Sequence, residues 1–506
     1  MRTVGANTEC NHAAALLGRQ VQMDRREFLR RAGAGVMAGT LLDQALHVGS
    51  AIAGPRSDDR PNILFCIADD PSWAHFGAYG DPVVQTPNFD RVARDGVLFQ
   101  RAYCSAPTCT ASRGAILTGQ AFYRLAEGAN LWSTLPARFP VYPDLLEAAG
   151  YFVGSRGKGW GPGDFRPGGR ARQPAGPTFP SFEAFLNAVP SGKPFCFWFG
   201  STDPHRPYEQ GVGVRSGMPI DAVRVPPFLP DTPEVRSDIL DYLWEIQRFD
   251  RDVGAMLQQL EERGLLHNTL VVVTGDNGMP FPRAKANLYE YGTRLPLAVS
   301  WPARVKGGRV VEDFISFTDF APTFLQAAGL KPLRGTTGRS FLDLLLSHQS
   351  GQIDAQRNRV ILGRERHANV RAGNVGYPCR ALRNRQFLYI RNFEPDRWPA
   401  GDPERFGDID GGPTKTFLLQ NRDDPRAATF FQLACGKRPP EELYDLEKDP
   451  AELTNVADRP EYATVLRRLR GELERELKRT GDPRMGRDGG RFDTYPYYGR
   501  QAQPET

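Results

Sequence analysis

Three uninterrupted runs of apolar residues stand out along the chain, and polar residues follow each run directly. The runs cover residues 62–68, 195–200 and 269–274. Such a run is typical of a β-strand that is buried on both faces of a parallel sheet. The polar residues that follow are Asp69 and Asp70, the stretch 201–205, and Asp276 and Asn277. Because ligands bind beyond the carboxyl ends of strands in α/β sheets, these residues are candidates for a functional site.

Segments with helical periodicity lie between and after these runs. They cover residues 87–95, 142–149, 238–263 and 320–328. Strands that alternate with helices predict an α/β fold, in which a large, mostly parallel sheet is sandwiched between helices. We expect this domain to span residues 54–370.

The pattern changes near residue 371, where short strand-like pieces appear at 379–382 and 387–390 between loops rich in Pro and Gly. A charged helical segment follows at 461–478. This organisation predicts a smaller α+β domain over residues 371–483. Residues 484–506 are rich in Gly, Tyr, Arg and Gln, which predicts a flexible tail.

The first 53 residues have the pattern of an export signal. Two pairs of adjacent arginines, at 25–26 and 30–31, precede an apolar stretch at 32–42, and Ala51-Ile52-Ala53 offers a cleavage site with small residues. The pattern resembles a twin-arginine signal and predicts export by the twin-arginine (Tat) machinery to the periplasm or the outside of the cell. A short amphipathic surface helix is the alternative. No other stretch approaches the roughly 20 apolar residues of a spanning helix, so we expect no stable insertion in the membrane.

Charge and cysteine content narrow the classes of partner. The formal net charge is only +5, which argues against a nucleic-acid partner. Arginine far outnumbers lysine, and its planar fork suits the anionic oxygens of an acidic sugar. The cysteines after residue 53 show no C-x-x-C spacing, so neither a zinc module nor a disulfide scaffold is predicted. The oligomeric state stays open, with a homodimer as one option.

The aspartates and the asparagine at the predicted strand ends suggest a metal site. Asp69, Asp70, Asp276 and Asn277 supply four hard oxygen donors and no imidazole. Such a set suits Ca²⁺, in preference to Mg²⁺, and does not suit zinc. Each pair also has a purely structural interpretation, since Asp caps helices and Asn-Gly forms hairpin turns. The position of both pairs after buried strands favours the metal.

The stretch around residue 109 reads Cys109-Thr110-Ala111-Ser112-Arg113-Gly114. It resembles the signature of the type I sulfatases, whose core has the alkaline phosphatase-like fold. The resemblance implies that a formylglycine-generating enzyme converts Cys109 to formylglycine, whose hydrate carries two hydroxyls on one carbon. It also implies that Ca²⁺ is bound by Asp69, Asp70, Asp276, Asn277 and the modified Cys109. A buried cysteine that opens a helix is the alternative for Cys109.

The stretches 155–161, 203–208 and 281–289 also resemble the sulfatase pattern. The resemblance gives one residue in each of them a role, as it does for Arg113. It implies that Arg113 holds the formylglycine oxygen and that Lys158 and Lys285 contact the sulfate. It implies that His205 protonates the leaving group. A salt bridge is the structural alternative for Arg113, and a solvated loop charge is the alternative for Lys285.

One position departs from the family. Where sulfatases have a histidine after the Gly-Lys pair, this chain has Trp160. The family histidine helps to deprotonate the hydrated aldehyde, and the loss of a general base can cost roughly 10²- to 10⁴-fold in rate. We expect Trp160 to stack on a sugar ring instead. Further residues predicted to contact the substrate are Glu365, Arg366, His367 and Arg380.

Within the sulfatases, the stretches 276–282 and 287–293 and the surroundings of Cys379 resemble the sulfamidases, which act on N-sulfoglucosamine. The resulting hypothesis is a calcium-dependent hydrolase that removes sulfate from a sulfated saccharide, with the N-sulfate of glucosamine as the candidate bond. It places the enzyme in glycosaminoglycan degradation. The alternatives are an O-sulfatase, a phosphonate or phosphate ester hydrolase of the same superfamily, and a catalytically weak glycan-binding protein.

Overall fold

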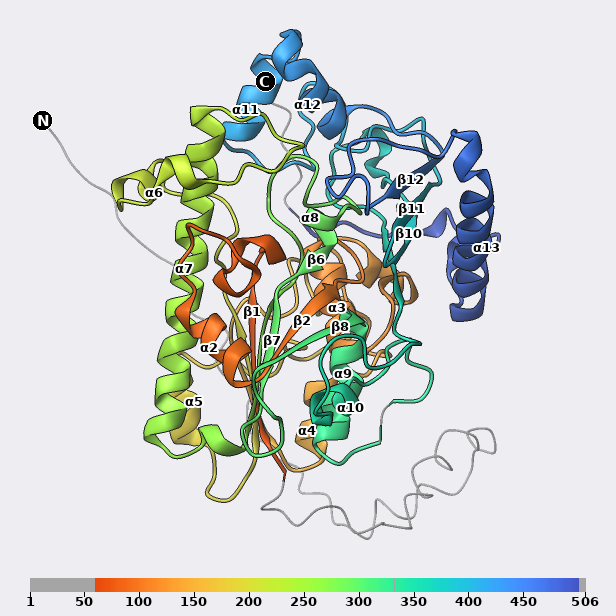
Figure 1. The fold of residues 1–506 in the computed structure, drawn as a ribbon. Coiled ribbons are helices and arrows are strands. Elements are labelled where there is room, and N and C mark those ends of the chain that lie inside the picture. Colours follow the sequence, from red (N-terminus) through yellow and green to blue (C-terminus); the bar gives the residue numbers. More distant parts are fainter. Residues whose placement is uncertain (1–59, 332, 500–506) are drawn as a thin grey trace, which may run out of the picture. The chain divides into compact units, whose positions relative to one another are not determined.

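A large sheet forms the centre of the first part of the chain (Figure 1). The computed structural model describes residues 60–331 and 333–499. The predicted export signal lies outside the described residues. The sheet has eight strands in the order β3-β4-β1-β5-β7-β2-β6, with β8 paired to β2. The strands are β1 (Asn62–Ala68), β2 (Val97–Tyr103), β3 (Phe152–Gly157), β4 (Phe195–Gly200), β5 (Thr269–Gly275), β6 (Arg294–Leu295), β7 (Leu297–Ser300) and β8 (Arg309–Ser316).

The centre of this sheet is parallel, as the apolar runs predicted. Strands β3, β4, β1 and β5 pair in parallel, whereas β7 is antiparallel to both β5 and β2. Side chains along β1 alternate between two cores, with Ile63, Phe65 and Ile67 in one and Leu64 and Cys66 in the other. Both faces of the strand are therefore buried, which explains its uninterrupted apolar sequence.

Helices cover both faces of the large sheet (Figure 1). One face packs against α2 (Pro87–Asp95), α5 (Phe182–Ala188) and α7 (Pro233–Glu262). The other face packs against α3 (Cys109–Thr118), α4 (Tyr142–Ala148), α9 (Phe320–Ala327) and α10 (Leu342–Leu346). The connections add the short helices α6 (Val212–Arg215) and α8 (Glu290–Thr293). The structure thus confirms the predicted α/β sandwich.

A smaller antiparallel sheet follows, in the order β12-β11-β10-β9. Its strands are β9 (Arg359–Arg364), β10 (Cys379–Asn384), β11 (Phe387–Asn392) and β12 (Glu441–Asp445). Helix α13 (Ala463–Thr480) packs on this sheet through Leu469, Leu473 and Leu477, which lie on one face of the helix. The remaining helices are α11 (Pro413–Gln420), α12 (Pro425–Cys435) and α14 (Arg491–Thr494).

Two predicted boundaries differ from the structure. The small sheet begins with β9, ahead of residue 371, because β9 pairs with β10 across a long loop. The predicted tail is packed as far as residue 499: Phe492 is fully buried, and its carbonyl accepts a hydrogen bond from Asn130 Nδ2 at 2.8 Å. The polar composition of this segment concealed its aromatic anchors, of which Phe492 is the most buried.

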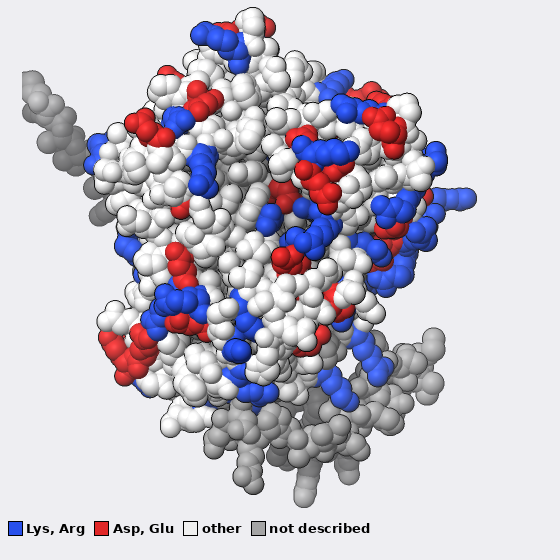
Figure 2. Space-filling model, in the orientation of Figure 1, with Lys and Arg blue, Asp and Glu red and all other residues white. Residues whose placement is uncertain are grey.

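Two surface features bear on partners. Figure 2 shows acidic and basic side chains interspersed on one face, without a large area of one sign. Within the described ranges, no helix combines the length and the apolar character that crossing a membrane requires.

Candidate active site

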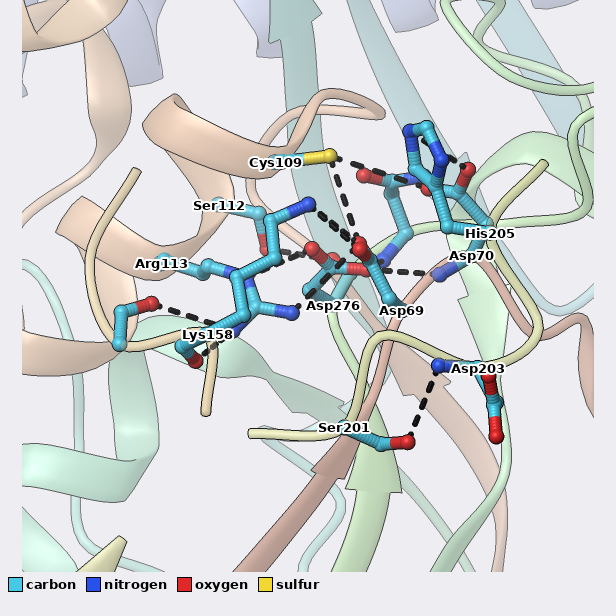
Figure 3. Close-up of polar contacts among 12 residues, drawn as sticks. Asp69, Asp70, Cys109, Ser112, Arg113, Lys158, Ser201, Asp203, His205 and Asp276 are labelled. Carbon is cyan, nitrogen blue, oxygen red and sulfur yellow. Dashed lines mark hydrogen bonds and ion pairs between the residues drawn. The ribbon is translucent and has the colours of Figure 1, made fainter. Parts of the chain in front are cut away.

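The predicted metal ligands meet at the carboxyl ends of β1 and β5 (Figure 3). The two strands pair in parallel with Ala68 opposite Gly275, so Asp69 and Asp276 leave the sheet side by side. The backbone N–H of Asp70 donates to Asp276 Oδ1 at 3.0 Å. Asp70 adopts a left-handed backbone with φ 71°, which Asp tolerates better than most residues. This turn directs its carboxylate toward that of Asp69.

Cys109 completes this cluster from the first residue of α3. Its Sγ lies 3.6 Å from Asp69 Oδ1 and 3.8 Å from Asp70 Oδ1. One ligand atom each from Asp69, Asp70, Cys109 and Asp276 lies within 4.8 Å of the other three, and all four residues are buried. Burial raises the pKa of the Cys109 thiol well above its ordinary value; Lys158 opposes this shift and the carboxylates add to it.

Two cations hold the carboxylates from the side of α3 and β3. Lys158 Nζ contacts both oxygens of Asp69, at 2.7 and 2.6 Å. Arg113 Nε donates to Asp276 Oδ2 at 2.7 Å, and its Nη1 donates to the Lys158 carbonyl at 2.6 Å. Burial alone would raise the pKa of Asp69, but the charges of Lys158 and Arg113 outweigh it and lower the pKa. The arginine therefore joins the start of α3 to the ends of β3 and β5.

A second group lies on the other side of Asp70. His205 follows β4, and its Nδ1 lies 2.6 Å from the Arg206 carbonyl oxygen. Lys285 Nζ contacts Asp70 Oδ2 at 2.7 Å, His205 Nε2 at 3.2 Å and Asp410 Oδ2 at 2.9 Å. The Arg206 carbonyl can only accept, so Nδ1 of His205 carries the hydrogen of this contact, and Nε2 faces Lys285 and Asp70.

Asp410 is a member of the site that the sequence did not predict. It lies in the loop before α11, far along the chain from every other member. Burial would raise the pKa of its carboxyl, but Lys285 and His205 together lower it. No motif marks this residue, because only the packing of the loop against Lys285 brings it to the site.

Among the described residues, two buried atoms at the cluster have no hydrogen-bond partner, Asn277 Oδ1 and Arg113 Nη2, and the first of them bears on the metal. Asn277 Nδ2 donates to Asp70 Oδ1 at 2.7 Å, but Asn277 Oδ1 is buried without a hydrogen bond. A buried carbonyl oxygen without a hydrogen bond, beside three carboxylates, would lower the free energy of unfolding unless a cation binds it. The donor set, rich in oxygen and without imidazole, suits Ca²⁺. The residues present therefore fit the predicted ion.

Trp160 does not lie where the stacking prediction requires. Its side chain is 4% exposed and belongs to the core between the sheet and the helices. The ring packs near Gly114 on the flank of α3, and its backbone is held by Gln173. A sugar cannot stack on a ring that is enclosed on both faces, so the prediction for Trp160 was wrong.

Three of the other predicted substrate contacts belong to buried structural networks. Arg380 is fully buried and pairs with Glu365 at 2.7 Å and with Asp482 at 2.6 Å. The Arg366 guanidinium donates to the carbonyls of Tyr495 and Pro496. These partners leave the three side chains no open face toward a substrate, because tertiary packing has turned them into the interior.

His367 lies close to the acidic cluster. Its Nδ1 is 2.8 Å from the hydroxyl of Thr108, the residue that precedes α3. Burial lowers the pKa of His367 to about 3, so the ring is neutral. Its contact with a substrate stays a prediction.

The alkaline phosphatase-like core, with an acidic cluster beyond the ends of its central strands, defines a class of hydrolases. The sulfatase family profile matches residues 61–163 and 172–330. The profile of the N-sulphoglucosamine sulphohydrolase C-terminal region matches residues 283–389. The chain therefore belongs to the sulfatase family.

Individual relatives agree with this assignment. The chain is 30% identical to a human N-sulphoglucosamine sulphohydrolase, in an alignment that covers 87% of this chain and 93% of the relative. It is also 30% identical to an ulvan-active sulfatase of Formosa agariphila, over 84% of this chain and 76% of the relative. Among solved structures, BT4656 in complex with its substrate D-glucosamine-2-N,6-O-disulfate shares the fold, with a TM-score of 0.61, 20% identity and coverage of 84% of this chain and 98% of that chain.

Proposed function

We propose that the protein is a calcium-dependent sulfatase that acts on a sulfated saccharide through a formylglycine formed from Cys109. The observation that carries the proposal is the position of Cys109 Sγ, 3.6 Å from Asp69 and 3.8 Å from Asp70, at the start of α3. A nucleophile at this point faces the carboxylates that would hold the ion. The N-terminus of the helix adds a positive potential that favours an anionic substrate.

The proposed ion would be held by Asp69, Asp70, Asp276 and Asn277 together with residue 109. When bound, Ca²⁺ neutralises charge on a sulfate oxygen and so makes the sulfur more open to attack. Formylglycine would supply a hydroxyl as the nucleophile and a second hydroxyl that later helps to expel the sulfate. Over the cycle, one water is consumed, the bond from sulfur to the leaving atom breaks, and sulfate and the free alcohol or amine are released.

The remaining side chains have roles that follow from their contacts. Lys158 has three N–H groups and places two against Asp69, so one is left to donate to a sulfate oxygen. Arg113 keeps Asp276 in place and fixes the Lys158 backbone, which preorganises the site. His205 is 34% exposed and borders Asp70, so it can reach a leaving atom and protonate it.

The N-sulfate of glucosamine is the bond we propose for cleavage. Support comes from the sulphohydrolase profile over residues 283–389, which begins beside Lys285, and from the human relative of that name. Side-by-side turnover of N-sulfoglucosamine, glucosamine 6-O-sulfate and a phosphonate monoester tests the choice. We expect the N-sulfate to have the highest kcat/KM. Inactivity on the N-sulfate with turnover of either ester would overturn this assignment and favour the corresponding alternative.

The decisive test of the nucleophile is mass spectrometry of the peptide that contains Cys109, isolated from the native host. We expect an aldehyde in place of the thiol, and we expect Cys109→Ala to lack activity while keeping its thermal stability within a few degrees. An unmodified thiol in a fully active sample would rule out formylglycine.

Calcium is tested separately by chelation. Treatment with EGTA should abolish turnover and lower the unfolding midpoint, because an ion that binds only the folded state stabilises it. Added Ca²⁺ should restore both readouts more completely than Mg²⁺. The variant Asn277→Ala should weaken this restoration, since it removes the oxygen that has no protein partner.

We also propose that residues 1–53 direct export of the folded enzyme. The proposal is supported by the adjacent arginines and the small residues at 51–53. Replacing Arg25 and Arg26 with lysine should retain the enzyme inside the cell, as measured by fractionation. Unchanged export of this variant would contradict the twin-arginine route.

A further inference from the structure

Asp410 is the one acidic side chain of the site that the metal cluster does not use. Its carboxylate contacts Lys285 Nζ at 2.9 Å through Oδ2. One ligand atom each from Asp410, Asp70 and His205 lies within 4.8 Å of the other two. The side chain of Asp410 is 26% exposed and that of His205 is 34% exposed, so both are open to an incoming substrate. Asp410 therefore stands beside the group that we expect to protonate the leaving atom.

The ion pair with Lys285 uses only one of the two oxygens of the Asp410 carboxylate, Oδ2. Lys285 Nζ also contacts Asp70 Oδ2 and His205 Nε2, so Asp410 Oδ2 is one of three groups around this ammonium. Among the described residues, none donates a hydrogen bond to Asp410 Oδ1. This oxygen is left for a ligand or for water.

A carboxylate in this place weakens the binding of an anion. Four carboxylates, those of Asp69, Asp70, Asp276 and Asp410, are grouped here; Arg113, Lys158 and Lys285 contact them, and the charges of Arg206 and Lys415 act on Asp410 from farther away. Like charges a few ångströms apart repel one another by about 1 to 4 kcal/mol, depending on the local dielectric. A site that only had to bind sulfate would be served better by an uncharged residue at 410. The carboxylate thus calls for a favourable interaction that compensates this repulsion.

The nature of the leaving atom supplies that interaction. A sulfamate nitrogen carries an N–H group, and the amine that it releases carries further N–H groups, whereas the bridging oxygen of a sulfate ester has only lone pairs. We propose that Asp410 selects an amine leaving group, by accepting the N–H of the sulfamate at Oδ1 and pairing with the released amine. This inference rests on the proposed function. Asp410 exchanges no proton in this role: the formylglycine oxygen would bond to sulfur, the S–N bond breaks, and the protonated form of His205 gives its Nε2 proton to nitrogen.

The same contact works against esters. A lone pair of the bridging oxygen would face a carboxylate oxygen, and two acceptors without a hydrogen between them repel. A site built to hydrogen-bond an N–H discriminates strongly against an analogue without it. Asp410 would then separate N-sulfate from O-sulfate substrates at the atom where they differ.

The test compares Asp410→Asn with the parent enzyme on N-sulfoglucosamine and on glucosamine 6-O-sulfate. We expect the ratio of the two kcat/KM values to fall about tenfold or more in favour of the ester, since tenfold corresponds to about 1.4 kcal/mol. Any disturbance of Lys285 acts on the same Asp70 and His205 in both reactions and cancels in the ratio. The matched control is Asp423→Asn, which makes the same change at a carboxylate that is 97% exposed, and it should leave the ratio unchanged.

A second measurement does not depend on turnover. Calorimetry should show that the parent protein binds glucosamine about tenfold more tightly than glucose, and that Asp410→Asn loses this preference. An unchanged substrate ratio together with an unchanged amine preference would overturn the role of Asp410, even in an active sulfamidase. Loss of the amine preference in a protein that hydrolyses neither substrate would instead support the amine contact and reject the proposed reaction.

Discussion

At the residue scale, Trp160 stands two positions after Lys158, where the resemblance to the sulfatases predicts a histidine. The ring fills the core beside α3, and its Nε1 is buried without a hydrogen bond. The backbone of the same segment accepts two hydrogen bonds from Arg113, at the Lys158 and Gly159 carbonyls. The packing of the Trp160 ring and the hydrogen bonds from Arg113 therefore hold the loop that carries Lys158 in place.

We expect Trp160→His to destabilise the protein without raising turnover. The smaller ring leaves a cavity and brings a second ring nitrogen to a place where Trp160 Nε1 already has no partner, which together cost at least about 2 kcal/mol. The loop that carries Lys158 would also loosen, so kcat/KM should fall. Thermal unfolding and turnover of N-sulfoglucosamine check both points. A rise in turnover at unchanged stability would show that position 160 reaches the reaction centre after all.

The sequence predicted the residues of the acidic cluster better than those around it. Asp69, Asp70, Asp276 and Asn277 could be foreseen because each follows an apolar run, and parallel strands bring such ends together. Asp410 carries no such signal, because its place depends on a long loop that folds back on Lys285. Glu365 and Arg380 were predicted to contact the substrate, whereas they neutralise each other in the interior.

At the scale of elements, a buried pair of glutamates connects the loop after β12 to the start of α8. The Glu452 carboxylate accepts the backbone N–H of Glu290 at 2.9 Å. Burial, with the charge of Glu290 adding to it, raises the pKa of Glu452 from 4.5 to about 8. The two elements are thus joined by a carboxyl group that is protonated near neutral pH.

The contribution of Glu452 to the free energy of unfolding should therefore fall as the pH rises from about 4.5 to about 8. Because the folded pKa of Glu452 lies above its unfolded value of 4.5, its contribution is complete below about pH 4.5 and is lost as the pH rises toward 8. The slope for one proton is at most about 1.4 kcal/mol per pH unit. Glu452→Gln keeps an acceptor for Glu290 but cannot ionise, so its free energy of unfolding should change less between pH 5 and 8. Urea titrations across that range measure it, and parallel profiles for the two proteins would contradict the assignment.

The strands most visible in the sequence were those buried on both faces. The predicted runs 62–68 and 195–200 coincide with β1 and β4, whose residues are all buried except Asn62. Strands β2, β6, β7 and β8 have mixed sequences or are very short, and no sequence pattern predicted them. Antiparallel β7 in particular inserts between β5 and β2, a pairing that depends on the whole sheet.

At the scale of the whole molecule, Arg380 ties the small sheet to segments on both sides of it. It lies on β10, pairs with Glu365 after β9 and with Asp482 after α13, and its guanidinium lies over the Phe122 ring at 4.9 Å. We expect Arg380→Ala to cost about 3–5 kcal/mol of stability, because it leaves two carboxylates buried with fewer partners. Chemical denaturation checks the cost. The ratio of kcat/KM for N- and O-sulfated substrates should stay unchanged, since the residue faces the interior.

The segment after residue 483 completes this network from the end of the chain. Arg484 Nη2 pairs with Glu365 Oε2 at 2.6 Å, Phe492 is fully buried, and Asp493 Oδ1 accepts the backbone N–H of Gly376 at 2.8 Å.

Removal of residues 484–506 should therefore lower the unfolding midpoint by more than the single change Phe492→Ala does. The point variant loses only the packing of one ring, roughly 3–5 kcal/mol, whereas the truncation also leaves Glu365 with Arg380 as its one cation. Calorimetric scans of both proteins beside the parent test this order. If the truncated protein unfolded at the parent temperature, the segment would be dispensable, and the flexible tail that composition predicted would be the better description.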